Sequence, residues 1–199
     1  MSALSLKVRG AVDRFGLKGP GAPAWLAAQG IAVPAEPNTW LGADAAADEA
    51  LLVARLGSSE FFLEDVPGST RLRDIEPDTV LHPPGVYPVL REDAAFLLAG
   101  VGALDVMAEV CNVDFGGLAR APRPGTAPPD AARPDAVRPL IMTSMVGVAV
   151  LVVPLVGAET SADGCSFRIW CDPTFGDYLS ESLGTVVRDC GGNFTGVSA

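Results

Sequence analysis

The sequence predicts an α+β protein made of two small lobes of mostly antiparallel sheet, with helices packed on one face. Two stretches carry this prediction, because each reads as a short apolar strand that leads directly into an amphipathic helix. They are 91–115 (REDAAFLLAGVGALDVMAEVCNVDF) and 167–179 (FRIWCDPTFGDYL). Strand and helix patterns alternate along the chain without a strict βαβα order, which favours antiparallel pairing.

The first stretch predicts a strand over 95–99 that is closed by Gly100 and Gly102. The apolar residues that follow recur at helical spacing and predict a helix. They are Leu104, Met107, Val110 and Cys111.

The second stretch predicts a strand over 165–171, in which apolar residues alternate with others. The residues expected to face the core are Phe167, Ile169 and Cys171. Trp170 falls on the opposite face of this strand. Because large aromatic residues at the centre of an interface often contribute much of its binding energy, we expect Trp170 to contact a protein partner or to line a cleft between the lobes. The alternative is that both faces of the sheet are covered and Trp170 is a core residue.

The last helix is predicted over 172–189, where Asp172 fits the N-cap and Pro173 the first helical position. Its apolar face comprises Leu179, Leu183, Val186, Val187 and Cys190. In both stretches the repeating residues are packing residues. Neither stretch contains a nucleophile with its base, a metal cluster or a phosphate-binding loop, so no catalytic residue is expected.

The remaining elements are shorter. A helix is expected over 22–29, and a hairpin is expected from strands over 50–56 and 60–64. One or two strands are expected over 140–153, and 65–88 reads as a surface excursion. The predicted organisation is an N-terminal arm (1–20), a first lobe (21–119), a Pro-rich loop (120–139), a second strand and helix unit (140–192) and a tail (193–199).

Composition bounds the partners. The 199 residues include 24 acids against 14 bases, a net charge of −10 that disfavours nucleic acid and anionic membrane surfaces. The mean hydropathy of +0.32 favours apolar surface that another subunit covers, with a tightly packed monomer as the alternative. The longest apolar run, 145–156, is shorter than the about 20 residues of a membrane-spanning helix. With no apolar core for a signal peptide at the N-terminus, we expect a cytoplasmic protein.

The four cysteines show no C-x-x-C spacing, and the single histidine, His82, lies far from them in the sequence. No metal site is therefore expected. We expect reduced core cysteines, with a disulfide or a reactive thiol as the alternative.

Several motifs carry a resemblance to a known family. They are a strand with A-x-x-L-L-A-G followed by a helix ending in C-N-V-D-F, then Asn38-Thr39-Trp40, the run LGSSEFFLE at 56–64, and FRIWCDPTFGDYL. Together they resemble the gamma subunit of heterotetrameric sarcosine oxidase, in the wider group of aminomethyltransferase-like, folate-binding folds. Similar subunits accompany N-methylglutamate dehydrogenase and other demethylases of methylated amines. The resemblance implies an aminomethyltransferase-like fold in the N-terminal part.

The resemblance implies a structural role beside a large subunit that carries flavin and folate. In aminomethyltransferases an acidic residue on the strand pair after the first repeat helix meets the reactive end of tetrahydrofolate, whereas 141–158 contains no carboxylate. We therefore expect a non-catalytic accessory subunit of an oxidative demethylase acting on sarcosine, N-methylglutamate or dimethylamine, with the catalytic subunits as partners and no directly bound cofactor.

Two alternatives stay open. One is a tetrahydrofolate-binding subunit that accepts the one-carbon (formaldehyde) unit released by such a complex, and the other is an unrelated α+β interaction domain. The nearest polar candidates for folate contacts, by motif position, are Asn112, Arg168 and Asp172. Arg168 has surface ion pairing as its alternative role, and Asp172 has helix capping.

Overall fold

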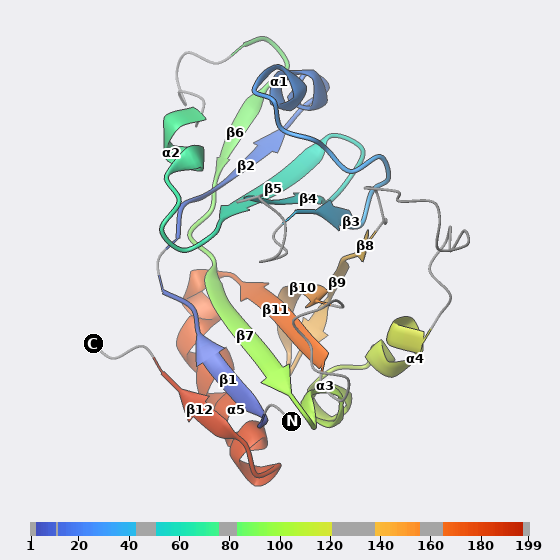
Figure 1. Cartoon of the computed structure of the whole chain (residues 1–199), viewed down its shortest axis with the longest axis vertical. Coiled ribbons are helices and arrows are strands. Elements are labelled where there is room, and N and C mark those ends of the chain that lie inside the picture. The colour runs from blue at the N-terminus through green and yellow to red at the C-terminus, as the bar shows by residue number, and fades with distance from the viewer. Residues whose placement is uncertain are drawn as a thin grey trace, which may run out of the picture. The chain divides into compact units, whose positions relative to one another are not determined.

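The chain folds as two compact units, each assembled from segments that are distant in the sequence (Figure 1). In the computed structural model the described residues are 3–10, 12–42, 51–75, 83–120, 138–155 and 165–196. The first unit comprises 1–10, 92–121 and 141–199, and the second comprises 11–91 and 122–140. Each unit is built around one six-stranded sheet.

The sheet of the first unit has the strand order β12-β1-β7-β11-β10-β9 (Figure 1). All neighbouring strands are antiparallel except β1 and β12, which are parallel. The strands are β1 (Ser5–Val8), β7 (Ala94–Gly100), β9 (Ile141–Met145), β10 (Val148–Leu155), β11 (Cys165–Cys171) and β12 (Asn193–Thr195). Four of these, β7, β9, β10 and β11, confirm strands predicted from the sequence.

Helices cover one face of this sheet. They are α3 (Ala103–Val110), α4 (Phe115–Arg120), the 3-10 turn η1 (Pro173–Phe175) and α5 (Gly176–Asp189). Their buried residues, including Met107, Leu179 and Leu183, join Phe167 and Ile169 of β11 in one apolar cluster. The amphipathic helices predicted after both apolar strands are therefore confirmed.

The sheet of the second unit has the order β6-β2-β5-β4-β3-β8, with every neighbouring pair antiparallel. The strands are β2 (Arg14–Lys18), β3 (Thr39–Leu41), β4 (Leu51–Arg55), β5 (Glu60–Asp65), β6 (Tyr87–Leu90) and β8 (Arg138–Pro139). Two short helices accompany it, α1 (Ala22–Ala28) and α2 (Arg71–Ile75). The predicted hairpin is formed by β4 and β5, and the predicted first helix is α1. Two mostly antiparallel sheets with few helices confirm the α+β class.

Both ends of the chain differ from the sequence-based expectation. Within residues 1–20, where an arm was expected, β1 and β2 are sheet strands, and Leu6 and Leu17 are fully buried. Within the expected tail, β12 pairs with β1. These strands are only three to five residues long, and their pairing partners, such as Leu98 opposite Leu6, lie far away in the sequence. A local pattern that short carries little signal.

The two Pro-containing segments also hold regular structure. The expected surface excursion at 65–88 contains α2 and the first residues of β6, while His82 lies outside the described residues. Of the expected Pro-rich loop, 121–137 lie outside the described residues, and Arg138 and Pro139 pair with β3 as β8. None of the helices in the described part combines the length and apolar character needed to cross a membrane.

All four cysteines are free, as expected, and they occupy different environments. Cys111 and Cys171 are buried in the apolar cluster of the first unit. Cys190, which was expected on the apolar face of the last helix, is exposed because α5 ends there and Cys190 is its C-cap residue.

Candidate functional site

The sheet of the second unit carries charged and aromatic side chains on the face opposite its apolar cluster. Phe15 of β2 and Leu63 of β5 belong to the cluster, so strand alternation turns Arg14 and Glu64 to the other face. We call this set the arginine–aromatic face. Its residues are Arg14, Trp40, Phe62, Glu64, Arg91 and Arg138.

Arg14 and Glu64 form an ion pair on this face. Arg14 Nε donates to Glu64 Oε2 at 2.5 Å, and the two side chains are only 7% and 0% exposed. Their strands pair directly in register, which holds the two side chains opposite each other. Both charges have been removed from water. Replacing only one of the two residues would therefore leave the other charge buried without its ion-pair partner, which strongly destabilises a fold.

Two further arginines stack on the aromatic rings of the face. The guanidinium carbon of Arg91 lies 4.8 Å from the ring centroid of Phe62, and that of Arg138 lies 4.8 Å from the ring centroid of Trp40. These are cation–π distances. Gly16, next to Phe62 across the sheet, lies close to its neighbours, because a Cβ there would lie 3.1 Å from Val89 Cβ and 3.3 Å from the carbonyl oxygen of Phe61.

Trp40 has a polar atom that the described residues do not satisfy. Its side chain is fully buried, and within the described residues no acceptor lies within hydrogen-bond reach of its indole Nε1–H. A buried donor that makes no hydrogen bond costs about 1–3 kcal/mol of stability. The sequence flagged Trp40 only as part of the Asn38-Thr39-Trp40 motif. Its position on a face with three arginines depends on strand pairings that the sequence does not reveal.

The polar candidates predicted from the sequence all lie in the first unit. Arg168 is partly buried on β11, facing away from the helices. Asp172 is exposed, and it follows Arg168 by four residues, about 13 Å of extended chain. Asn112 is exposed after the last turn of α3. The role of these three residues in folate binding stays a prediction.

Asp172 has a defined structural role. Its carboxylate accepts hydrogen bonds from the backbone N–H and the hydroxyl of Thr174, at 2.9 Å and 2.5 Å, at the start of η1. These hydrogen bonds hold the pKa of Asp172 below its usual value. The capping alternative given for Asp172 is thus what the structure contains.

Trp170 is buried within the chain. It lies opposite to Phe167 and Ile169 on β11, as the alternation predicted, but its side chain is 1% exposed. This burial agrees with a core position for Trp170, and its role at an interface stays a prediction. Alternation fixes the face of a strand on which a residue lies, but it does not say whether that face is covered.

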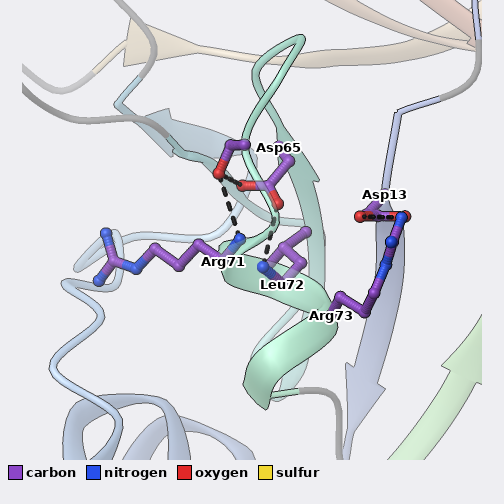
Figure 2. A network of polar contacts seen from close by, with 6 residues as sticks. Asp13, Asp65, Arg71, Leu72 and Arg73 are labelled. Atoms are coloured by element: carbon purple, nitrogen blue, oxygen red, sulfur yellow. Dashed lines mark hydrogen bonds and ion pairs between the residues drawn. The ribbon is translucent and has the colours of Figure 1, made fainter.

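A second polar network fastens α2 to the sheet of the second unit (Figure 2). The buried carboxylate of Asp65 accepts hydrogen bonds from Ser69 Oγ at 2.9 Å and from the backbone N–H of Leu72 at 3.0 Å. Beside it, exposed Arg73 pairs with Asp13 of the neighbouring segment at 3.0 Å. These contacts connect α2 to β5 and to the chain before β2, which indicates a structural role.

Two cysteines of the first unit have raised pKa values. Burial, with added repulsion from Asp93 and Asp172, raises the pKa of Cys171 to about 11. Burial also raises the pKa of Cys165. Within the described residues no cluster of metal-ligating side chains occurs.

The acceptors that a bound tetrahydrofolate would need can be compared with the polar groups of this structure. The aminopyrimidine edge of a pterin needs a buried carboxylate or amide as its acceptor. Among the described residues the buried carboxylates are those of Glu64 and Asp65. Glu64 is paired with Arg14, and Asp65 is bonded to Ser69 and Leu72. The buried carboxylates of the described residues are thus already engaged within the chain.

Comparison with known proteins places this fold. No protein-family model matches the sequence, and no curated protein matches it. A chain of the heterotetrameric sarcosine oxidase from Corynebacterium sp. U-96, solved in complex with pyrrole 2-carboxylate, is similar with a TM-score of 0.64 and 20% identity. That match covers 92% of this chain and 83% of the other.

The glycine cleavage system aminomethyltransferase T from Bartonella henselae is similar with a TM-score of 0.55 and 15% identity. The match covers 98% of this chain but 48% of the aminomethyltransferase, so this chain spans about half the length of that enzyme. These likenesses define an aminomethyltransferase-like fold. The likeness to a chain of heterotetrameric sarcosine oxidase extends over most of both chains, which confirms the expected resemblance at the level of fold.

Proposed function

We propose that this chain is a non-catalytic, gamma-type subunit of a heteromeric oxidative demethylase of a methylated amine. The observation that carries the proposal is the extent of the likeness to one chain of heterotetrameric sarcosine oxidase. It covers 92% of this chain and 83% of that one, whereas this chain accounts for only 48% of an aminomethyltransferase. Likeness over most of a chain that belongs to a heterotetrameric enzyme supports a role as a subunit of an assembly.

The chemistry of the side chains supports the same proposal. The charged groups of the arginine–aromatic face are engaged with one another or stacked on rings. Oxidation of an amine needs a redox cofactor, which in this proposal is a flavin held by the partner subunits. The substrate class is a secondary methylated amine such as sarcosine, N-methylglutamate or dimethylamine.

The test is purification of the full chain, carrying an affinity tag, from its own cells under native conditions. We expect it to co-purify in a fixed ratio with subunits that show flavin absorbance and oxidise a methylated amine. The chain expressed alone should show no such oxidation. A chain that is monomeric in its own cells, or active on its own, would refute the proposal.

A second candidate function is supported by the likeness to aminomethyltransferase T. In this alternative the chain binds tetrahydrofolate and accepts the one-carbon unit released by the demethylase. Because the buried carboxylates are already bonded within the chain, we expect calorimetry to give no binding of tetrahydrofolate at micromolar concentration. Micromolar binding that is lost in Arg168→Ala would favour the folate-binding alternative over the accessory subunit.

A further inference from the structure

The 3-10 turn η1 and the first turn of α5 present two large apolar side chains to solvent. Phe175 is 51% exposed and Tyr178 is 54% exposed. Three acids are exposed beside them in the sequence, and we call the whole set the α5 surface. It comprises Asp172, Phe175, Asp177, Tyr178 and Glu181.

The fold forces these aromatic side chains outward. Leu179 and Leu183 anchor the opposite side of α5 in the apolar cluster, so a rotation that buried Tyr178 would expose both leucines. Gly176 brings the first turn of the helix close to β7, because a Cβ there would lie 2.9 Å from Ala94 Cβ. The helix that carries Tyr178 and directly follows Phe175 is therefore packed closely against the sheet.

Tyr178 is also tied to the β9–β10 hairpin. Its hydroxyl donates to the backbone carbonyl of Val146 at 3.2 Å. Val146 has a φ of +44° and Gly147 a φ of +86°, an unusual conformation for a β-branched residue. This contact holds the ring of Tyr178 in place without covering it.

The charge around the aromatic side chains is negative and uncompensated. Asp177 and Glu181 lie one helical turn apart, and among the described residues neither forms an ion pair. Like charges at this spacing destabilise a helix by about 0.2–0.5 kcal/mol. The wider region has the same sign, since 140–199 contains six acids, two arginines and no lysine.

We propose that the α5 surface docks an arginine-bearing surface of a catalytic subunit in the assembly proposed above. A guanidinium group stacks on Phe175 or Tyr178 and at the same time pairs with Asp177 or Glu181. Burying exposed aromatic rings supplies the apolar contact, and the acids select a basic partner. This inference rests on the proposed function and names the chemistry of one contact within it.

The charge of the surface also selects between possible occupants. Two copies of this chain meeting symmetrically through the α5 surface would place acid against acid. Such like-charge contact opposes association. A basic patch on a different subunit meets no such penalty.

The experiment measures assembly between variants of this chain and the flavin-containing subunits that co-purify with the wild-type chain. One variant, Phe175→Ala/Tyr178→Ala, removes the rings, and a second, Asp177→Asn/Glu181→Gln, removes the acids. Aromatic anchors at interface centres are typical hot spots, so the first should raise the Kd of assembly at least about tenfold. The second should weaken assembly most at low salt and reduce its salt dependence.

Matched controls lie elsewhere on the chain. Asp105→Asn/Glu109→Gln removes two exposed acids at the same spacing on α3, and Tyr87→Ala removes a ring of similar exposure, 52%, on β6. Both controls should assemble like the wild-type chain. Phe175→Ala alone gives a readout that does not involve the hydrogen bond of Tyr178.

The outcomes separate this inference from the proposed function. Assembly that is weakened by the α5 variants and not by the controls supports the inference. If the α5 variants assemble with the flavin-containing subunits as tightly as the controls do, the inference is overturned and the proposed function stands. If no flavin-containing subunit co-purifies, the proposed function fails and the inference with it. Self-association that Phe175→Ala abolishes would assign the surface to a second copy and overturn the inference.

Discussion

The two units use sheets of equal size but fasten their helices differently. In the first unit α5 is 14 residues long and places Leu179, Leu183 and Val187 in the apolar cluster. In the second unit α1 and α2 have only seven and five residues. Helices that short are not stable by themselves and need tertiary contacts. For α2 those contacts include the hydrogen bonds of Asp65 (Figure 2).

The faces of the two sheets turned away from the helices differ as well. On β11 that face presents buried Trp170 and partly buried Arg168. In the second unit it presents the arginine–aromatic face with its buried ion pair. Apolar burial therefore stabilises the first unit. The second unit depends in addition on a few buried polar contacts, whose loss would lower the free energy of unfolding strongly.

The largest expected effect follows from breaking the buried ion pair. Arg14→Met leaves the carboxylate of Glu64 without this partner in a buried position. We expect the free energy of unfolding to fall by about 3–5 kcal/mol in urea titrations. The double variant Arg14→Met/Glu64→Leu should recover most of that loss, because neither charge is then buried. A single variant as stable as the wild type would mean that the pair is not a main support of the second unit.

The next effect tests the anchor of α2. Asp65→Ala removes the acceptor of two hydrogen bonds and leaves the N–H of Leu72 unsatisfied in a buried position. The expected loss is about 1–3 kcal/mol, with hydrogen exchange of the α2 amides accelerated first. Asp13→Asn, which disrupts the exposed pair with Arg73, is the control and should cost about 0–1 kcal/mol. Equal losses in both variants would contradict the special role of Asp65.

A smaller effect of opposite sign is expected in the first unit. Val146→Asn places a residue that tolerates positive φ before Gly147, in a two-residue hairpin that favours Asn-Gly. Relief of the backbone strain should stabilise the chain by up to about 1 kcal/mol in thermal unfolding, since part of the gain is lost with the apolar contact of Val146. Val113→Asn, a partly buried control without positive φ, should destabilise. Destabilisation by both would show that packing outweighs strain at Val146.

The smallest effect concerns the thiols. Cys190 is exposed and should react first with a thiol reagent in the native protein. Cys171, whose pKa is raised to about 11, should react only after unfolding, because its thiolate fraction at pH 8 is about one in a thousand. Desolvation and then the nearby carboxylates of Glu109 and Asp105 raise the pKa of Cys190, so Glu109→Gln should speed its reaction. Rapid labelling of Cys171 by the thiol reagent in the native protein, detected by mass spectrometry, would contradict its burial.

Much of the fold was predictable because its strongest signals are local. The alternation of Phe167 and Ile169 and the helical spacing of Leu179 and Leu183 identify β11 and α5 directly. By contrast, β1, β2, β8 and β12 are short, and each is defined by partners distant in the sequence. Contacts of that kind leave no periodic trace.

The candidate site was less predictable for the same reason. Arg14, Trp40 and Arg138 come from three separate segments, and only the order of the strands brings them onto one face. The burial of Trp170 likewise depends on whether its face of the sheet is covered. A strand pattern specifies two faces, and tertiary structure decides which of them meets water.

The central claim is that this chain supports a demethylase without taking part in its chemistry. The most direct measurement is the rate at which the methylated amine reduces the flavin in a single turnover, with and without this chain in the assembly. We predict rates that agree within about twofold, together with a lower thermal stability of the assembly that lacks the chain. A reduction rate that falls by about a hundredfold or more in an otherwise intact assembly would contradict the claim and make this chain part of the catalytic machinery.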